Sequence, residues 1–159
     1  MPFSRHWIMH VEAFLRIKNS IIKKERKKVK NKISVCGLSC NHCFLGEWCA
    51  SCRSEYNCCS YGTLFEKRLC PNVKCAKEKG YDGCYDCPNL DLCEVGFYEP
   101  KSDGSKFSKI EAMFIRKHGT KAYVKALDNM HKEYDYAKMQ EIIGDCVDGL
   151  TLLEEYLNK

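Results

Sequence analysis

Cysteine is the residue type through which this chain could do chemistry, since twelve of its thirteen cysteines fall within residues 36–93. Two thiolates three positions apart in a tight turn can bind one metal ion, and two such turns complete the tetrahedral shell that zinc prefers. Three pairs have this spacing, namely Cys40/Cys43, Cys49/Cys52 and Cys84/Cys87. The other clustered thiols are Cys36, Cys58, Cys59, Cys70, Cys75 and Cys93. The sequence therefore predicts metal binding, with these twelve cysteines as candidate ligands.

The number of thiols also suggests the number of ions. Twelve thiolates match three four-sulfur zinc sites, and we expect two to three zinc ions. Cys58 and Cys59 would point in different directions in an extended backbone, so one of them could be left out and His42 could then complete the set. Otherwise His42 is a polar turn residue. The order of the cysteines does not say which of them share a site.

Metal is predicted to replace a hydrophobic core in this stretch, where large apolar side chains such as Trp48, Tyr61 and Phe65 are scattered. A structural zinc ion contributes about 10–16 kcal/mol of apparent binding free energy, which becomes folding free energy. Closed four-sulfur sites leave no open position for a catalytic water. The function favoured by the sequence is therefore a non-catalytic interaction or adaptor module with an unidentified protein partner.

An iron–sulfur or thiol redox protein is the main alternative. Cys36, Cys40 and Cys43 have the spacing of the triad that holds the cluster in radical enzymes using S-adenosylmethionine. Those enzymes surround the cluster with a barrel of alternating strands and helices, and this chain is too short and lacks that alternation. No signal-peptide core or membrane span is evident, so we expect a cytoplasmic protein with reduced thiols.

The elements that must position the thiols fall into several segments. Residues 33–99 are rich in glycine and proline, which predicts short hairpins and one-turn helices between metal knuckles: a small, loop-rich α+β module of zinc-knuckle type. Residues 100–107 are predicted as a linker, and residues 108–159 as an α-helical domain of about three helices.

The helix boundaries are predicted from end signals and apolar periodicity. Ser108 and Glu111 have the spacing of a capping box, which predicts a helix start, and Gly119 is suited to ending that helix. A second helix is expected from about Thr120. The third and longest is expected to carry an apolar stripe from Met139 to Leu157, on which Cys146, the thirteenth cysteine, is a small buried apolar residue.

Residues 1–32 form a separate basic arm, with ten Lys or Arg residues against two acidic ones. Their apolar positions recur at helical spacing, which predicts an amphipathic helix. Such an arm could bind nucleic acid through phosphate contacts, or it could be a solvated appendage. Translation starting near Val29 would leave it out of the native domain.

The cysteine pattern also resembles a known family. It opens with Cys36-Gly37-Leu38-Ser39-Cys40-Asn41-His42-Cys43 and continues to Cys84-Tyr85-Asp86-Cys87-Pro88 and Cys93. Over about residues 33–99 it is similar to a prokaryotic cysteine-rich family, domain of unknown function family 3795, which is associated with zinc binding. By this resemblance the family cysteines are Cys36, Cys40, Cys43, Cys49, Cys52, Cys70, Cys75, Cys84, Cys87 and Cys93. The resemblance implies a metal and no particular reaction.

Overall fold

The computed structural model describes residues 33–43, 45–46, 49–60, 69–101, 105–145 and 148–159. Within it, Asn31–Lys159 form one compact unit. The predicted arm of residues 1–32 and the predicted apolar role of Cys146 lie outside the described residues. In the part of the chain that is described, no helix is both long enough and apolar enough to cross a membrane.

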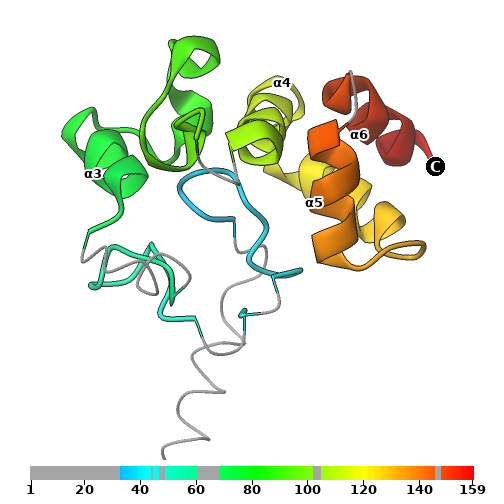
Figure 1. The fold of residues 1–159 in the computed structure, drawn as a ribbon, viewed down its shortest axis with the longest axis horizontal. Coiled ribbons are helices and arrows are strands. Elements are labelled where there is room, and N and C mark those ends of the chain that lie inside the picture. Colours follow the sequence, from blue (N-terminus) through cyan, green and yellow to red (C-terminus); the bar gives the residue numbers. More distant parts are fainter. Residues whose placement is uncertain (1–32, 44, 47–48, 61–68, 102–104, 146–147) are drawn as a thin grey trace, which may run out of the picture. The chain divides into compact units, whose positions relative to one another are not determined.

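The C-terminal part is helical, as the apolar periodicity predicts (Figure 1). It consists of α4 (Ser105–Met130), α5 (Tyr136–Asp145) and α6 (Gly149–Asn158). Their apolar stripes meet in a core in which the largest side chains are fully buried, among them Phe114, Leu127, Met130, Met139, Ile143 and Leu153. Burial of these side chains, at about 25 cal/mol for each Å² of apolar surface, is what holds the three helices together.

Helix α4 begins earlier than the sequence predicts. It starts at Ser105, inside the stretch expected to be a linker, so Ser108 and Glu111 lie within the helix and do not cap it. Both residues are fully buried, and the Ser108 hydroxyl donates a hydrogen bond to the Phe97 carbonyl oxygen at 3.3 Å. The capping-box prediction was wrong because these polar side chains are directed into the protein and not to the helix end.

The predicted break at Gly119 is confirmed. Its φ of 82° and ψ of 165° interrupt the helical backbone of α4 at that residue. A positive φ of this size is accessible to glycine at no steric cost, whereas a residue with a Cβ would be strained. The segment after Gly119 therefore behaves as the second helix expected from Thr120.

The prediction of one long third helix was wrong, because the chain forms two short helices there, α5 and α6. Asp148 caps α6, and its Oδ1 accepts a hydrogen bond from the Thr151 amide at 3.0 Å. Gly149 lies so close to α5 that an added Cβ would be 2.8 Å from the Ile143 carbonyl oxygen. Glycine at this position allows α6 to pack tightly against its neighbour.

The cysteine-rich part contains no β-strand among the described residues, so the β elements and hairpins expected there are not found in that part of the chain. An isolated antiparallel bridge pairs Ile33 with Ser39. The regular elements are α3 (Pro71–Glu78) and the 3₁₀ turns η1 (Cys84–Asp86), η2 (Leu90–Leu92) and η3 (Gly96–Tyr98). Local turns form in place of strands because backbone hydrogen bonds join residues three positions apart, as from the Cys93 amide to the Leu90 carbonyl oxygen.

The cysteine-rich part and the helices share one core. Val73, Leu90 and Tyr98 are buried in the same apolar cluster as the residues of α4 to α6. The Tyr98 hydroxyl donates a hydrogen bond to the Cys36 carbonyl oxygen at 2.7 Å. Gly37 packs against α4 so closely that an added Cβ would lie 3.0 Å from Ala112. The helices thus position the first cysteine loop.

Candidate metal centre

Four of the predicted ligands lie around one cavity of about 420 Å³, which we call the four-thiol cavity. They come from α3, from the two ends of the turn at η1 and from the residue after η2, and they are Cys75, Cys84, Cys87 and Cys93. The Cys87 amide donates to the Cys84 carbonyl oxygen at 3.0 Å, and this bond closes the turn between these two thiols. The sequence predicts the pairing of Cys84 with Cys87 and leaves open the contributions of Cys75 and Cys93.

The surroundings of the four-thiol cavity favour a bound cation. Burial raises the pKa of Cys84 to about 11, so its thiolate is disfavoured in the absence of a positive charge. The amide nitrogen of the Asn72 side chain lies 3.7 Å from Cys84 Sγ and can donate to it. Lys79 also lines the cavity, and the charges of Cys75 and Cys87 raise its pKa. A divalent cation stabilises thiolates far more strongly than these contacts do.

A second cavity, of about 310 Å³, gathers seven more of the predicted ligands, and we call it the seven-thiol cavity. These seven are Cys36, Cys40, Cys43, Cys49, Cys52, Cys59 and Cys70. The rest of the lining is mainly apolar and includes Val35, Leu38, Val73, Phe97 and Phe107. Among the described residues that line this cavity, none carries a charge. The cavity therefore offers soft sulfur donors in an environment of low polarity.

Polar hydrogens point at several sulfurs of the seven-thiol cavity. Backbone amides lie close to two of them, with Val35 N at 3.3 Å from Cys52 Sγ and Ser60 N at 3.2 Å from Cys49 Sγ. The Ser51 amide also donates to Cys49 Sγ, at 3.4 Å, and Ser51 has a positive φ of 72°. Hydrogen bonds to sulfur stabilise negative charge there and are one of the means by which proteins tune metal–thiolate centres.

His42 does not take the ligand position that the sequence left open for it. Its Nδ1 lies 2.7 Å from the Ser39 hydroxyl oxygen, and its Nε2 lies 3.0 Å from Asp128 Oδ1. Both ring nitrogens are therefore engaged, and neither cavity is lined by the ring. His42 instead fastens the Cys40 loop to α4. Cys58 is buried but lines neither cavity.

The donor set fits a thiophilic metal, although the coordination shells are not closed. Among the described residues no disulfide joins the clustered cysteines, and the seven cysteine sulfurs are the soft donors of the seven-thiol cavity. Zn–S bonds are about 2.3 Å long, which requires the sulfurs of one site to converge on a point. Within the ranges that the structure describes, no three His, Cys, Asp or Glu side chains are arranged to hold an ion in this way. Metal binding would therefore draw the thiols of each cavity inward.

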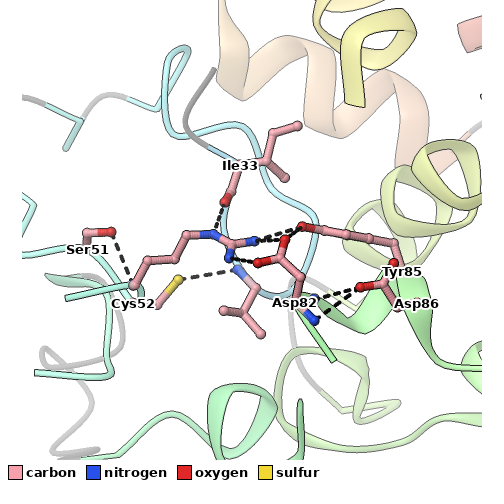
Figure 2. A network of polar contacts seen from close by, with 9 residues as sticks. Ile33, Ser51, Cys52, Asp82, Tyr85 and Asp86 are labelled. Atoms are coloured by element: carbon pink, nitrogen blue, oxygen red, sulfur yellow. Dashed lines mark hydrogen bonds and ion pairs between the residues drawn. The ribbon is translucent and has the colours of Figure 1, made fainter. Parts of the chain in front are cut away.

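A polar network joins segments of the chain that carry different cysteines (Figure 2). Arg53, next to Cys52, donates through Nε to the Ile33 carbonyl oxygen at 2.7 Å and through Nη1 to Asp82 Oδ1 at 2.9 Å. Its Nη2 donates to the Tyr85 hydroxyl oxygen at 2.7 Å. One guanidinium thus links the Cys49/Cys52 knuckle to the turn that holds Cys84 and Cys87.

We expect Arg53→Lys to lower the free energy of unfolding by about 1–2 kcal/mol, because an ammonium cannot reproduce the planar fork of donors. Urea unfolding at saturating zinc would measure the loss. Arg116→Lys is the matched control, since the Arg116 side chain is as exposed as that of Arg53 (33% against 34%) but contacts the carboxylate of Asp91 through one nitrogen. We expect that change to cost less than about 0.5 kcal/mol. Equal losses in the two variants would contradict a bracing role for Arg53.

A buried polar group beside the seven-thiol cavity was missed by sequence reasoning. Tyr136 lines the cavity, and its hydroxyl accepts from the Ser39 amide at 3.0 Å and lies 3.5 Å from Glu111 Oε2. Glu111 Oε1 and the nearby Tyr123 hydroxyl have no hydrogen-bond partner of good geometry in the described part of the chain. Helical spacing could have predicted that Glu111 is buried, because it lies three and four positions before Phe114 and Ile115 and therefore on the same helix face. Both of these residues are buried.

Comparison of the chain with protein-family models, with curated proteins and with solved structures finds no match. The resemblance to the cysteine-rich family 3795 therefore stays a prediction. The functional argument rests on the residues and geometry of the two cavities.

Proposed function

We propose that this chain is a zinc-binding protein with a structural four-sulfur site formed by Cys75, Cys84, Cys87 and Cys93. The observation that carries the proposal is that these four thiols, which are spread over residues 75–93, border one cavity. Four sulfurs fill the tetrahedral shell of zinc and leave no position for water, so the site would stabilise the fold without catalysing a reaction.

The proposed role is that of a non-catalytic interaction module in the cytoplasm, where thiols stay reduced. Two apolar side chains at the rim of the four-thiol cavity support it. Leu92 is 85% exposed and Val95 is 37% exposed, and both line this cavity. Zinc would fix the backbone that presents them, so that a protein partner could bury them at little entropic cost. Nucleic-acid binding by residues 1–32 and an iron–sulfur cluster remain the alternative predictions.

We expect Cys87→Ser to remove one zinc ion per chain, because a hydroxyl is a much poorer zinc ligand than a thiolate. Elemental analysis of protein purified anaerobically would count the ions. Cys146→Ala is the matched control, since Cys146 lies outside the cysteine cluster in the sequence, and it should leave the zinc content unchanged. A zinc-free parent protein, or full zinc content in Cys87→Ser, would contradict the proposal.

A further inference from the structure

We propose that the seven-thiol cavity holds a binuclear zinc–thiolate centre in which the sulfur of Cys52 bridges the two ions. The inference rests on the proposed function only in taking zinc as the metal. It assigns a role to the seven predicted ligands that line the second cavity. The four-thiol cavity would then hold one zinc ion and the seven-thiol cavity two.

The number of sulfurs is the first argument. One tetrahedral zinc ion uses four sulfurs, which would leave three of the seven thiols of this cavity without a role. Two tetrahedral ions that share one sulfur use seven. A [4Fe–4S] cluster takes four cysteines and leaves the same surplus of three as a single zinc ion does. A bridged pair of ions is therefore the arrangement that accounts for every thiol in the lining.

Charge is the second argument. No charged side chain lines the cavity in the described residues, and most of the remaining lining is apolar. Thiolates gathered in such a place need positive charge from within the cavity, since burying an unpaired charge is costly. Two divalent ions neutralise more of the sulfur charge than one ion does. Zinc and its thiophilic relatives suit the site because oxygen and nitrogen donors are scarce in it.

The position of Cys52 is the third argument. Cys52 belongs to the knuckle that also contains Cys49, but its sulfur accepts the Val35 amide, which directly precedes Cys36. The sulfur of Cys52 thus reaches from its own knuckle toward the first cysteine loop. Cys52 and Cys36 are both buried and line the same cavity. The contact with the Val35 amide therefore places the sulfur of Cys52 between its own knuckle and the first cysteine loop.

Cadmium-113 NMR of the full chain tests the proposal without any substitution, because cadmium occupies zinc–thiolate sites and carries a nuclear spin. We expect three resonances in the range of sulfur-only coordination, of which two are split by coupling to each other through the shared sulfur. The third, from the four-thiol cavity, should be an uncoupled singlet. Three uncoupled resonances would mean separate sites and would overturn the bridged centre, as would a single resonance or a brown protein that contains iron.

Two variants separate this inference from the proposed function. Cys87→Ser should remove the singlet and leave the coupled pair, whereas Cys52→Ser should abolish the coupling and leave the singlet. If the singlet is present and the coupled pair is absent in the parent protein, the binuclear centre is refuted and the structural zinc site stands. If the coupled pair is present and the singlet is absent, the proposed four-sulfur site fails while the binuclear centre stands.

Discussion

Removal of the proposed zinc ions under reducing conditions is expected to unfold the cysteine-rich part of this protein while α4, α5 and α6 keep much of their helical structure. Each structural zinc ion contributes about 10–16 kcal/mol of apparent binding free energy, which is as large as the whole stability of a typical domain, about 5–15 kcal/mol. Among the residues around the thiols that the structure describes, the regular elements are short turns and the eight-residue helix α3. A helix of that length is not stable in water without tertiary contacts.

The helices should respond less because their core does not depend on metal. Phe114, Leu127, Met139, Ile143 and Leu153 are fully buried, and none of them lines either thiol cavity. Some loss is still expected at the junction, where the Cys36 carbonyl accepts from Tyr98 and Gly37 packs on Ala112. The helices would therefore become less stable without unfolding.

Circular dichroism and limited proteolysis during titration with a strong chelator would measure this difference. We expect early cleavage within residues 33–99, later cleavage within residues 105–159, and recovery of protection when zinc is restored. The reductant must be present throughout, so that disulfides cannot replace the metal. Unchanged dichroism and unchanged protease resistance after complete removal of metal would show that the fold does not need zinc.

The sequence predicted the chemistry of the candidate site better than it predicted which cysteines share a cavity. Spacing identified the knuckles Cys40/Cys43, Cys49/Cys52 and Cys84/Cys87, and the structure places two of them at one cavity and the third at the other. The contribution of Cys75 could not be foreseen, because it lies on helix α3 and has no cysteine partner at the spacing of a knuckle. Which cysteines share a cavity depends on how the loops pack in space. The spacing of neighbouring residues in the sequence carries no information about this packing.

Helix boundaries failed where tertiary contacts override local signals. Ser108 and Glu111 fit a capping box by type and spacing, yet both are fully buried, Ser108 against the Phe97 carbonyl and Glu111 beside Tyr136 of α5. The stripe from Met139 to Leu157 reads as one helix, but Gly149 permits a close approach to Ile143 that a continuous helix would not make. At Gly119 local and tertiary preferences agree, and the predicted break is found there.

Glu111→Gln is expected to change the pH dependence of stability more than any other conservative substitution in the helices. Burial raises the pKa of Glu111 from the ordinary value of 4.5 to about 8, although the nearby hydroxyls of Tyr123 and Tyr136 act in the opposite direction. The carboxyl group is thus protonated in the folded protein at neutral pH. In the unfolded chain the same carboxyl group is ionised.

The sign of the effect follows from proton binding. Between about pH 4.5 and pH 8 the folded state holds a proton on Glu111 that the unfolded state has released. The free energy of unfolding should therefore fall as the pH rises through this window, by up to about 1.4 kcal/mol for each pH unit. Glutamine keeps the shape and stays neutral, so the variant should lack this slope and be more stable than the parent by several kcal/mol at pH 8, on the order of 4 kcal/mol.

Urea unfolding of parent and variant from pH 5 to pH 9 would measure the slope. Both proteins keep all the cysteines, so the pH dependence of metal binding cancels in their difference. Glu154→Gln is the control: hydrogen bonds from Lys117 and His118 lower the pKa of Glu154, so its contribution to stability is lost only below the usual carboxyl range, and this substitution should leave the slope between pH 5 and pH 9 unchanged. Parallel curves for the parent and Glu111→Gln would mean that Glu111 ionises without cost. In that case the unpartnered Oε1 must be solvated, and the interior beside the seven-thiol cavity would be accessible to water.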